Sequence, residues 1–94
     1  MNRPVIAPSI LSADFSDIAS AIKLIEEAGA EWIHADVMDG QFVPPISFGS
    51  KMIADIRKRT RLPIDVHLMT VQPENHIDDF ILAGADYITF HAEA

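Results

Sequence analysis

The sequence predicts an α/β fold in which β-α units follow one another as β-α-β-α-β-α-β and make up about half of a barrel. Short apolar or alternating segments, which suit strands, take turns with segments whose apolar residues recur at helical spacing. The connections between them are short, which favours parallel strands with helices on one face. The expected strands also carry His and Asp on a face that an open parallel sheet would keep apolar, and a barrel mouth accommodates such groups.

Composition and charge narrow the class of protein. The 94 residues suffice for one small domain, and 49% hydrophobic with 22% charged residues is typical of a globular protein. A formal net charge of −7 argues against nucleic acid or a membrane surface as partner, because either needs a basic face. The chain has no cysteine, which excludes disulfides and Cys-ligated zinc. Prolines and an aspartate interrupt the N-terminal apolar run, so we expect neither a signal peptide nor a membrane span, and a cytoplasmic location.

The first β-α unit is expected at the N-terminus. Residues 3–8 contain an apolar run between prolines, which is consistent with a short buried strand. Ser12 or Asp14 is the candidate N-cap of the helix that follows. Gly29 fits the left-handed position that ends a helix.

Two strands, expected at residues 32–39 and 64–69, repeat one plan. In each, alternate positions are apolar and define a face directed to the core. The opposite face carries His34, Asp36, Met38, Asp65, His67 and Met69. A His and an Asp two residues apart project in parallel and can bind one metal ion.

The remaining elements follow the same alternation. An irregular connection with two adjacent prolines comes after Gly40, and a helix is expected at residues 50–59. Its basic C-terminal end is most simply a solvated cluster favoured by the helix dipole, with a phosphate site as the alternative. A further helix is expected at residues 74–82, closed by Gly84, and a last strand at residues 87–91.

Four motifs carry a resemblance to a known family. They are PSILSADF at 8–15, HADVMDGQFVPP at 34–45, IDVHLM at 64–69 and ITFHAEA at 88–94. Together they closely resemble the N-terminal half of ribulose-phosphate 3-epimerase, a metal-dependent TIM barrel of the pentose phosphate pathway. The likeness spans essentially the whole chain, so residues 1–94 are expected to be the N-terminal half of a TIM-barrel epimerase domain. Pro45 stands where the family often has Asn, a difference confined to the loop.

The resemblance implies an activity and a site. The activity is epimerisation of D-ribulose 5-phosphate, a small sugar phosphate, to D-xylulose 5-phosphate. The implied metal ligands are His34, Asp36 and His67, with Asp36 also one of two acid/base residues. The implied substrate contacts are Ser9, His67, Met38 and Met69. The second catalytic aspartate and the phosphate-binding loops belong to the family's C-terminal half, so the isolated chain is expected to be nearly inactive.

The chemistry explains why these residue types are needed. Inversion next to a carbonyl removes a proton from one face of a carbon and returns one to the other, so it needs two acid/base groups and stabilisation of the enediolate charge. One divalent metal ion supplies that stabilisation, and imidazole with carboxylate ligation admits zinc, iron, manganese or cobalt. Methionine side chains give an apolar, polarizable wall.

Other interpretations remain open. His34 and His67 could be hydrogen-bonded core histidines, Met38 and Met69 could be core fillers, and His91 is expected to be structural. The enzyme could act on another ketose phosphate. The chain could also be an inactive half-barrel fragment that self-associates through its two unpaired strand edges, and for this reason a homo-oligomer is expected.

Overall fold

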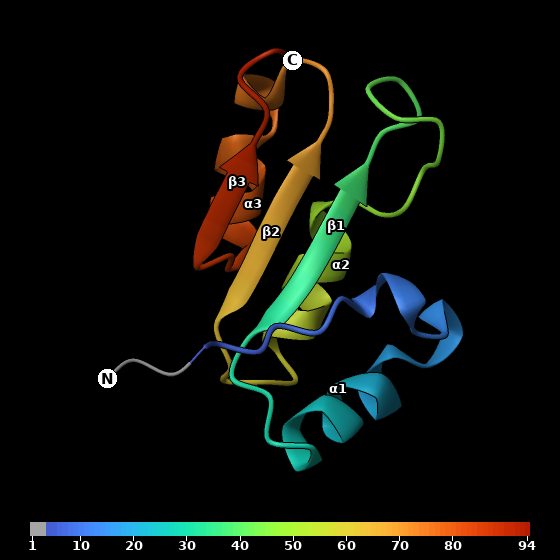
Figure 1. Cartoon of the computed structure of the whole chain (residues 1–94), viewed down its shortest axis with the longest axis vertical. Coiled ribbons are helices and arrows are strands. Elements are labelled where there is room, and N and C mark those ends of the chain that lie inside the picture. Colours follow the sequence, from blue (N-terminus) through green and yellow to red (C-terminus); the bar gives the residue numbers. More distant parts are fainter. Residues whose placement is uncertain (1–3) are drawn as a thin grey trace.

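The computed structural model describes residues 4–94, and a sheet of three parallel strands lies at the centre of this part of the chain (Figure 1). The strands are β1 (Ile33–Met38), β2 (Ile64–Met69) and β3 (Tyr87–Phe90), in that order across the sheet. The helices are α1 (Ile18–Glu27), α2 (Ser50–Arg57) and α3 (Ile77–Ala83). Helices α2 and α3 cover one face of the sheet, and α1 lies beside the N-terminal end of β1. The predicted parallel β-α units are confirmed.

The core lies between this sheet and the helices. Alternate residues of β1 and β2 are buried, namely Ile33, Ala35, Val37, Ile64, Val66 and Leu68. The helices contribute Ile22, Ile53, Ile56 and Phe80. Burying an aliphatic side chain of this size contributes about 1.5–3 kcal/mol relative to leaving it exposed. The predicted apolar face is therefore the one packed on the helices, and the face with His and Asp is turned away from them.

The parallel register arranges the second face in rows. Asp36 of β1 lies beside His67 of β2, and one row further along Met38 lies beside Met69. At the N-terminal end of the strands, the ring of Trp32 stacks on that of Tyr87 with their centroids 4.3 Å apart. The two polar rows, His34 with Asp65 and Asp36 with His67, thus lie between an aromatic pair and a methionine pair.

The strand expected at residues 3–8 is not formed, so this prediction is wrong in the part that the structure describes. Arg3 lies outside the described residues. Pro4 and Pro8 have no amide hydrogen to donate to a ladder. Val5 and Ile6 are 48% and 62% exposed, so the run is not buried either.

This N-terminal segment nevertheless follows the edge of β1. The amide of Trp32 donates to the carbonyl of Ile6, and the amide of His34 donates to that of Pro8, at 3.2 and 2.9 Å. Ser9 forms an isolated parallel bridge with His34. Because the donors in these bonds are amides of β1 and of the residue before it, the prolines do not prevent the segment from placing Ser9 beside the polar face of the sheet.

Helix α1 begins later than expected because two single turns precede it. They are 3₁₀ helices at Ile10–Ser12 and Phe15–Asp17. Asp14 caps the second of these turns, and Asp17 is the N-cap of α1, so neither Ser12 nor Asp14 caps the helix itself. The predicted end at Gly29 is confirmed, since its φ of 81° lies in the left-handed region.

Other element bounds differ by a few residues. Helix α2 ends at Arg57, and a 3₁₀ turn (Pro73–Asn75) precedes α3, which ends at Ala83 and is closed by the predicted Gly84. Strand β3 ends at Phe90, so His91 lies just beyond it. No helix in the described part of the chain combines the length and apolar character needed to cross a membrane.

The predicted solvated cluster at the end of α2 holds for the exposed Lys58, Arg59 and Arg61, whereas Arg57 makes structural contacts. Its guanidinium donates to the carbonyls of Thr60, Leu62 and Gly84 and to the carboxylate of Asp86. The same carboxylate accepts from the amide of Ile64, the first residue of β2. One side chain thus joins the end of α2, the start of β2 and the turn between α3 and β3.

We predict that Gly84→Ala destabilises the fold more than Gly29→Ala does. Both glycines have positive φ, 111° and 81°, and an alanine there costs about 1–2 kcal/mol in backbone strain. A methyl group at Gly84 would also lie 2.5 Å from Cδ of Arg57, whereas nothing lies within 4 Å of one at Gly29. Urea unfolding should show an additional loss of about 1–3 kcal/mol for Gly84→Ala. Equal losses would contradict a close contact with Arg57.

Candidate functional site

Two neighbouring strands bring His34, Asp36 and His67 together on the face turned away from α2 and α3. His34 and Asp36 project from β1, and His67 projects from β2 beside Asp36. One possible ligand atom from each lies within 4.8 Å of the others, and no other group of three or more His, Cys, Asp or Glu residues meets this condition within residues 4–94. The three side chains are 24%, 17% and 26% exposed, so the group is partly desolvated but remains accessible.

The carboxylate of Asp36 is the centre of this group. Its Oδ1 lies 2.9 Å from Nε2 of His34 and 3.2 Å from Nδ1 of His67. Its Oδ2 accepts a hydrogen bond of 2.7 Å from the hydroxyl of Ser9. Both imidazoles therefore direct one nitrogen to the same oxygen, and Ser9 fixes the other oxygen.

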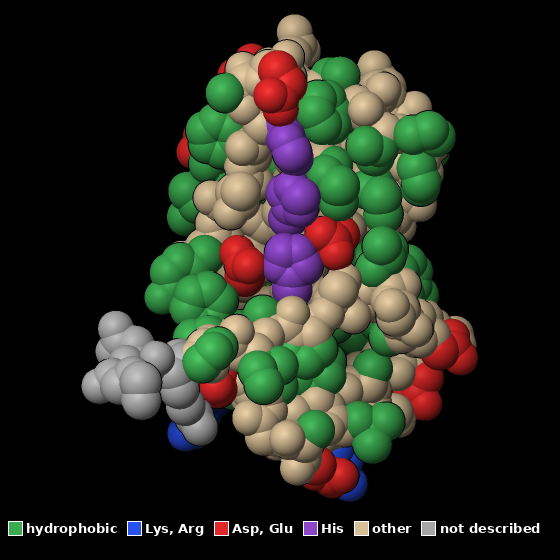
Figure 2. Space-filling view, in the orientation of Figure 1, with side chains coloured by type: hydrophobic (Ala, Val, Ile, Leu, Met, Phe, Trp, Pro, Cys, Tyr) green, Lys and Arg blue, Asp and Glu red, His purple; other side chains and the backbone are tan. Residues whose placement is uncertain are grey.

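Each imidazole has a second partner on its other nitrogen. Nδ1 of His34 lies 2.9 Å from the carboxylate of Asp65. Nε2 of His67 lies 2.8 Å from Nε2 of His91, and Nδ1 of His91 lies 3.0 Å from Glu93. Figure 2 shows histidine side chains in a column on this face, with acidic side chains beside it.

The surroundings shift the pKa values of the two β1 side chains, His34 and Asp36. Burial lowers the pKa of His34, but hydrogen bonds and charge interactions with Asp65 and Asp36 outweigh it, so the pKa is raised overall. Burial raises the pKa of Asp36, but hydrogen bonds from Ser9, His34 and His67 and the charge of His34 lower it overall. Asp36 is therefore an anion at neutral pH and can bind a cation or accept a proton.

The residues predicted as substrate contacts fall into two groups by their distance from Asp36. Ser9 and His67 contact Asp36 directly. Met38 and Met69 are partners in register, one row beyond Asp36 and His67 on the same face, and both are half-buried. Sequence patterns thus selected side chains that share one face, although they did not distinguish direct contacts from the next row.

Two residues that order the adjacent loops complete the surroundings of the site. Asp39 accepts hydrogen bonds from the amides of Gln41, Phe42 and Val71, each 2.9 Å long. Ser47 donates to the carbonyl of Asp36 and accepts from the amide of Met38. Sequence reasoning missed Ser47, because a lone serine in an irregular loop carries no distinguishing pattern. It also missed Glu93, although His-Ala-Glu at 91–93 repeats the His-Ala-Asp of 34–36.

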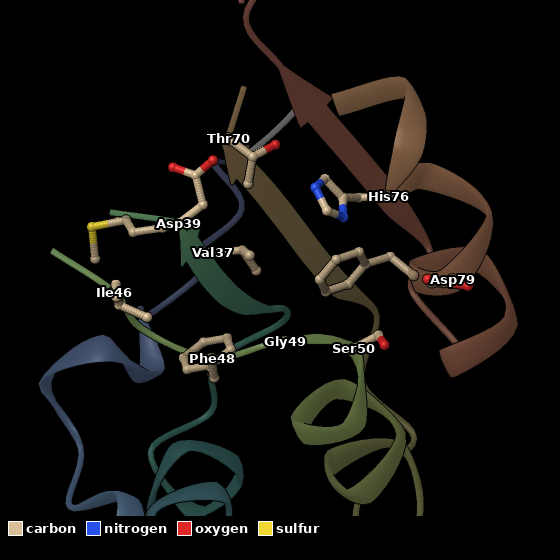
Figure 3. Close-up of a pocket in the computed structure, with 11 residues that line it drawn as sticks. Val37, Asp39, Ile46, Phe48, Gly49, Ser50, Thr70, His76 and Asp79 are labelled. Atoms are coloured by element: carbon tan, nitrogen blue, oxygen red, sulfur yellow. The ribbon is translucent and has the colours of Figure 1, made fainter. Parts of the chain in front are cut away.

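A separate cavity of about 340 Å³ lies on the helix side of the sheet (Figure 3). Val37, Phe48 and Phe80 give it an apolar lining, and His76 and Asp79 also border it. Val37 and Phe80 belong to the core side of the sheet, whereas Met38 and Asp39 border the same cavity at the C-terminal end of β1. None of the three candidate ligands, His34, Asp36 and His67, lines the cavity.

We predict that Asp39→Asn reduces stability at pH 7 and its dependence on pH. Burial raises the pKa of Asp39, but hydrogen bonds from the amides of Gln41, Val71 and Phe42 lower it overall. A carboxyl with a lowered folded-state pKa contributes stability that is present above its unfolded pKa of 3.8 and is lost as pH falls through the folded pKa.

Urea unfolding between about pH 7 and pH 2 measures this dependence. Asp39→Asn should flatten the acid side of the curve, whereas the same change at the exposed Asp78 is the control for loss of one charge. An Asp39→Asn curve parallel to that of the unmodified chain would contradict the assignment.

Comparison with known proteins gives a family. The sequence matches the Ribulose-phosphate 3 epimerase family over residues 5–94. It is 56% identical to a ribulose-phosphate 3-epimerase of Synechocystis sp., over 95% of this chain and 39% of the relative. Identity is 53% to that of Treponema pallidum and 52% to that of Bacillus subtilis, each over 95% of this chain and 41% of the relative.

The extent of these matches agrees with the fold. The chain spans about two fifths of the length of these curated relatives and matches their N-terminal part. The family is one of TIM-barrel enzymes, and the three parallel strands with helices between them are consistent with consecutive β-α units of such a barrel. The chain belongs to the ribulose-phosphate 3-epimerase family.

Proposed function

We propose that this chain contributes the metal-binding part of an active site that interconverts D-ribulose 5-phosphate and D-xylulose 5-phosphate. The observation that carries the proposal is the convergence of His34, Asp36 and His67 on one face of the sheet. The names of the relatives supply the reaction, since those proteins are called ribulose-phosphate 3-epimerases. The geometry supports it, because proton removal next to a carbonyl needs a carboxylate close to a group that stabilises negative charge on oxygen.

The three side chains fit one divalent metal ion. Donor atoms that each lie about 2.0–2.2 Å from a single ion are separated by about 3 Å or slightly more. The distances of 2.9 and 3.2 Å from Oδ1 of Asp36 to the two imidazoles agree with this spacing. The hydrogen bond between Nδ1 of His34 and Asp65 favours Nε2 as the ligand atom of His34. Zinc, iron, manganese and cobalt all accept such ligands.

The residues of the chain would divide the work as follows. A bound metal ion acts as a Lewis acid that stabilises negative charge on the substrate oxygens. Asp36, whose pKa is lowered, accepts the proton from the substrate carbon. Ser9 holds Oδ2 of that carboxylate and so fixes its orientation towards the substrate.

The side chains around Asp36 would contact the sugar phosphate. Ser9 and His67 already lie against Asp36, so a substrate within reach of this carboxylate is also within reach of them. Met38 and Met69 would form an apolar, polarizable wall next to the reacting carbon. Such a wall limits access of water to the carbanionic intermediate.

We predict that His34→Ala or His67→Ala abolishes stoichiometric metal binding, because each removes one of three proposed ligands. Elemental analysis of the purified protein measures the metal content. His76→Ala is the matched control, since His76 borders the cavity on the other side of the sheet. Full metal content in both ligand variants would refute the site.

We predict that Asp36→Asn lowers the rate of proton removal by about 10²- to 10⁴-fold, because an amide cannot act as the base. Incubation with ribulose 5-phosphate in deuterated water at saturating metal measures exchange of the C3 proton, a half-reaction that needs only one acid/base group. Asp79→Asn makes the same chemical change at the helix-side cavity and should leave the exchange rate unchanged. Exchange at the normal rate in metal-loaded Asp36→Asn would show that another group is the base.

A further inference from the structure

We propose that His91, backed by Glu93, is a positioning residue that holds His67 with its Nδ1 directed to the metal site. This inference rests on the metal site proposed above and deepens it. His91 follows β3 directly, and its Nε2 lies 2.8 Å from Nε2 of His67. The two contacts of His67 thus lie on opposite nitrogens, with Asp36 at Nδ1 and His91 at Nε2.

The hydrogen-bond directions follow from the donor inventory. A neutral imidazole has one N–H donor and one bare nitrogen that can accept a hydrogen bond or bind a metal ion. For Nδ1 of His67 to bind the metal ion, its hydrogen must be on Nε2, where it donates to Nε2 of His91. His91 then carries its hydrogen on Nδ1, and this group donates to the carboxylate of Glu93 at 3.0 Å. With a metal ion on Nδ1 of His67, every nitrogen of both rings has a partner in this arrangement.

The opposite arrangement leaves a conflict between two acceptors. If His91 donated to His67, Nδ1 of His91 would be bare and would face the carboxylate of Glu93. His67 would then carry its hydrogen on Nδ1, which is the atom needed as ligand. The carboxylate of Glu93, as the last acceptor in this series of hydrogen bonds, therefore favours donation from His67 to His91. That direction leaves Nδ1 of His67 free for a metal ion.

A carboxylate also orients the other proposed histidine ligand, His34, but without an intervening imidazole. Asp65 contacts Nδ1 of His34 directly and favours Nε2 as the ligand atom. At His67 the carboxylate is one imidazole further away, because His91 lies between the ring and Glu93. Each proposed histidine ligand is thus linked by hydrogen bonds to a carboxylate. Asp65 of β2 serves His34 directly, and Glu93 after β3 serves His67 through His91.

Ring contacts hold His91 in place. The centroid of its ring lies 5.0 Å from that of His67 and 5.0 Å from that of Phe42. The amide of Phe42 is in turn bound by Asp39. The side chain of His91 is 35% exposed and that of Glu93 is 70% exposed, so replacement of His91 should have the larger effect.

The test compares zinc affinity in variants of the full chain, with zinc alone as ligand and a chromophoric chelator as competitor. His91→Phe keeps a ring against Phe42 but has no acceptor, and its zinc affinity should fall by about 10- to 100-fold. His91→Gln offers an amide oxygen to Nε2 of His67 and should recover most of that loss. Glu93→Gln should have a smaller effect than His91→Phe, and His76→Phe, at the helix-side cavity, should have none.

A spectroscopic readout separates positioning from packing. In zinc-loaded protein, nitrogen-15 NMR should detect a hydrogen on Nε2 of His67 that exchanges slowly with water. The signal should be lost or exchange rapidly in His91→Phe and be retained in His91→Gln. Circular dichroism checks folding, and His91→Leu replaces His91→Phe if that variant does not fold.

The outcomes distinguish this inference from the proposed function. Tight zinc binding by the unmodified chain together with unchanged affinity in His91→Phe would overturn the role of His91 and leave the metal site intact. Equal losses in His91→Phe and His91→Gln would also overturn it, because packing alone would then explain the effect. No zinc binding by the unmodified chain would refute the metal site itself, and the role of His91 with it.

Discussion

The parallel register of β1 and β2 is the constraint on which the rest of this structure depends. It places Asp36 beside His67 and His34 beside Asp65, so two short sequence patterns become one cluster. A slip of one residue would move every side chain of a strand to the opposite face, burying His and Asp in the core and exposing Ile, Val and Leu. Burial of those aliphatic side chains against α1, α2 and α3 therefore fixes the positions of the polar groups.

The polar face is stabilised by hydrogen-bond pairing, whereas the core is stabilised by burial of apolar side chains. Partly buried imidazoles and carboxylates are costly unless they are paired, and here their hydrogen bonds link Asp65, His34, Asp36, His67, His91 and Glu93 in an unbroken series. Residues outside the strands complete this series: Ser9 arrives along the edge of β1, and His91 and Glu93 follow β3. The strands provide the proposed ligands, and the adjoining segments orient them.

Periodicity in the sequence was sufficient to predict β2 at its observed bounds and the buried faces of β1 and β2, because alternation of apolar residues directly reflects burial. It was insufficient at residues 3–8, where an apolar run between prolines suggested a buried strand although Val5 and Ile6 are exposed. The contacts of Arg57 and Ser47 were also unpredictable, because both depend on carbonyl groups that only the folded chain brings within reach. Motifs predicted Ser9, His34, Asp36 and His67, which the structure brings together, whereas the contact of Glu93 depends on where the chain turns after β3.

The central claim is that one face of the sheet forms a single metal site around Asp36. The most direct measurement is anomalous diffraction from crystals of the zinc-loaded protein. Our account predicts one strong peak about 2.0–2.2 Å from Nε2 of His34, Nδ1 of His67 and a carboxylate oxygen of Asp36. A peak bound instead by His91 and Glu93, or no peak on this face at full zinc loading, would contradict it.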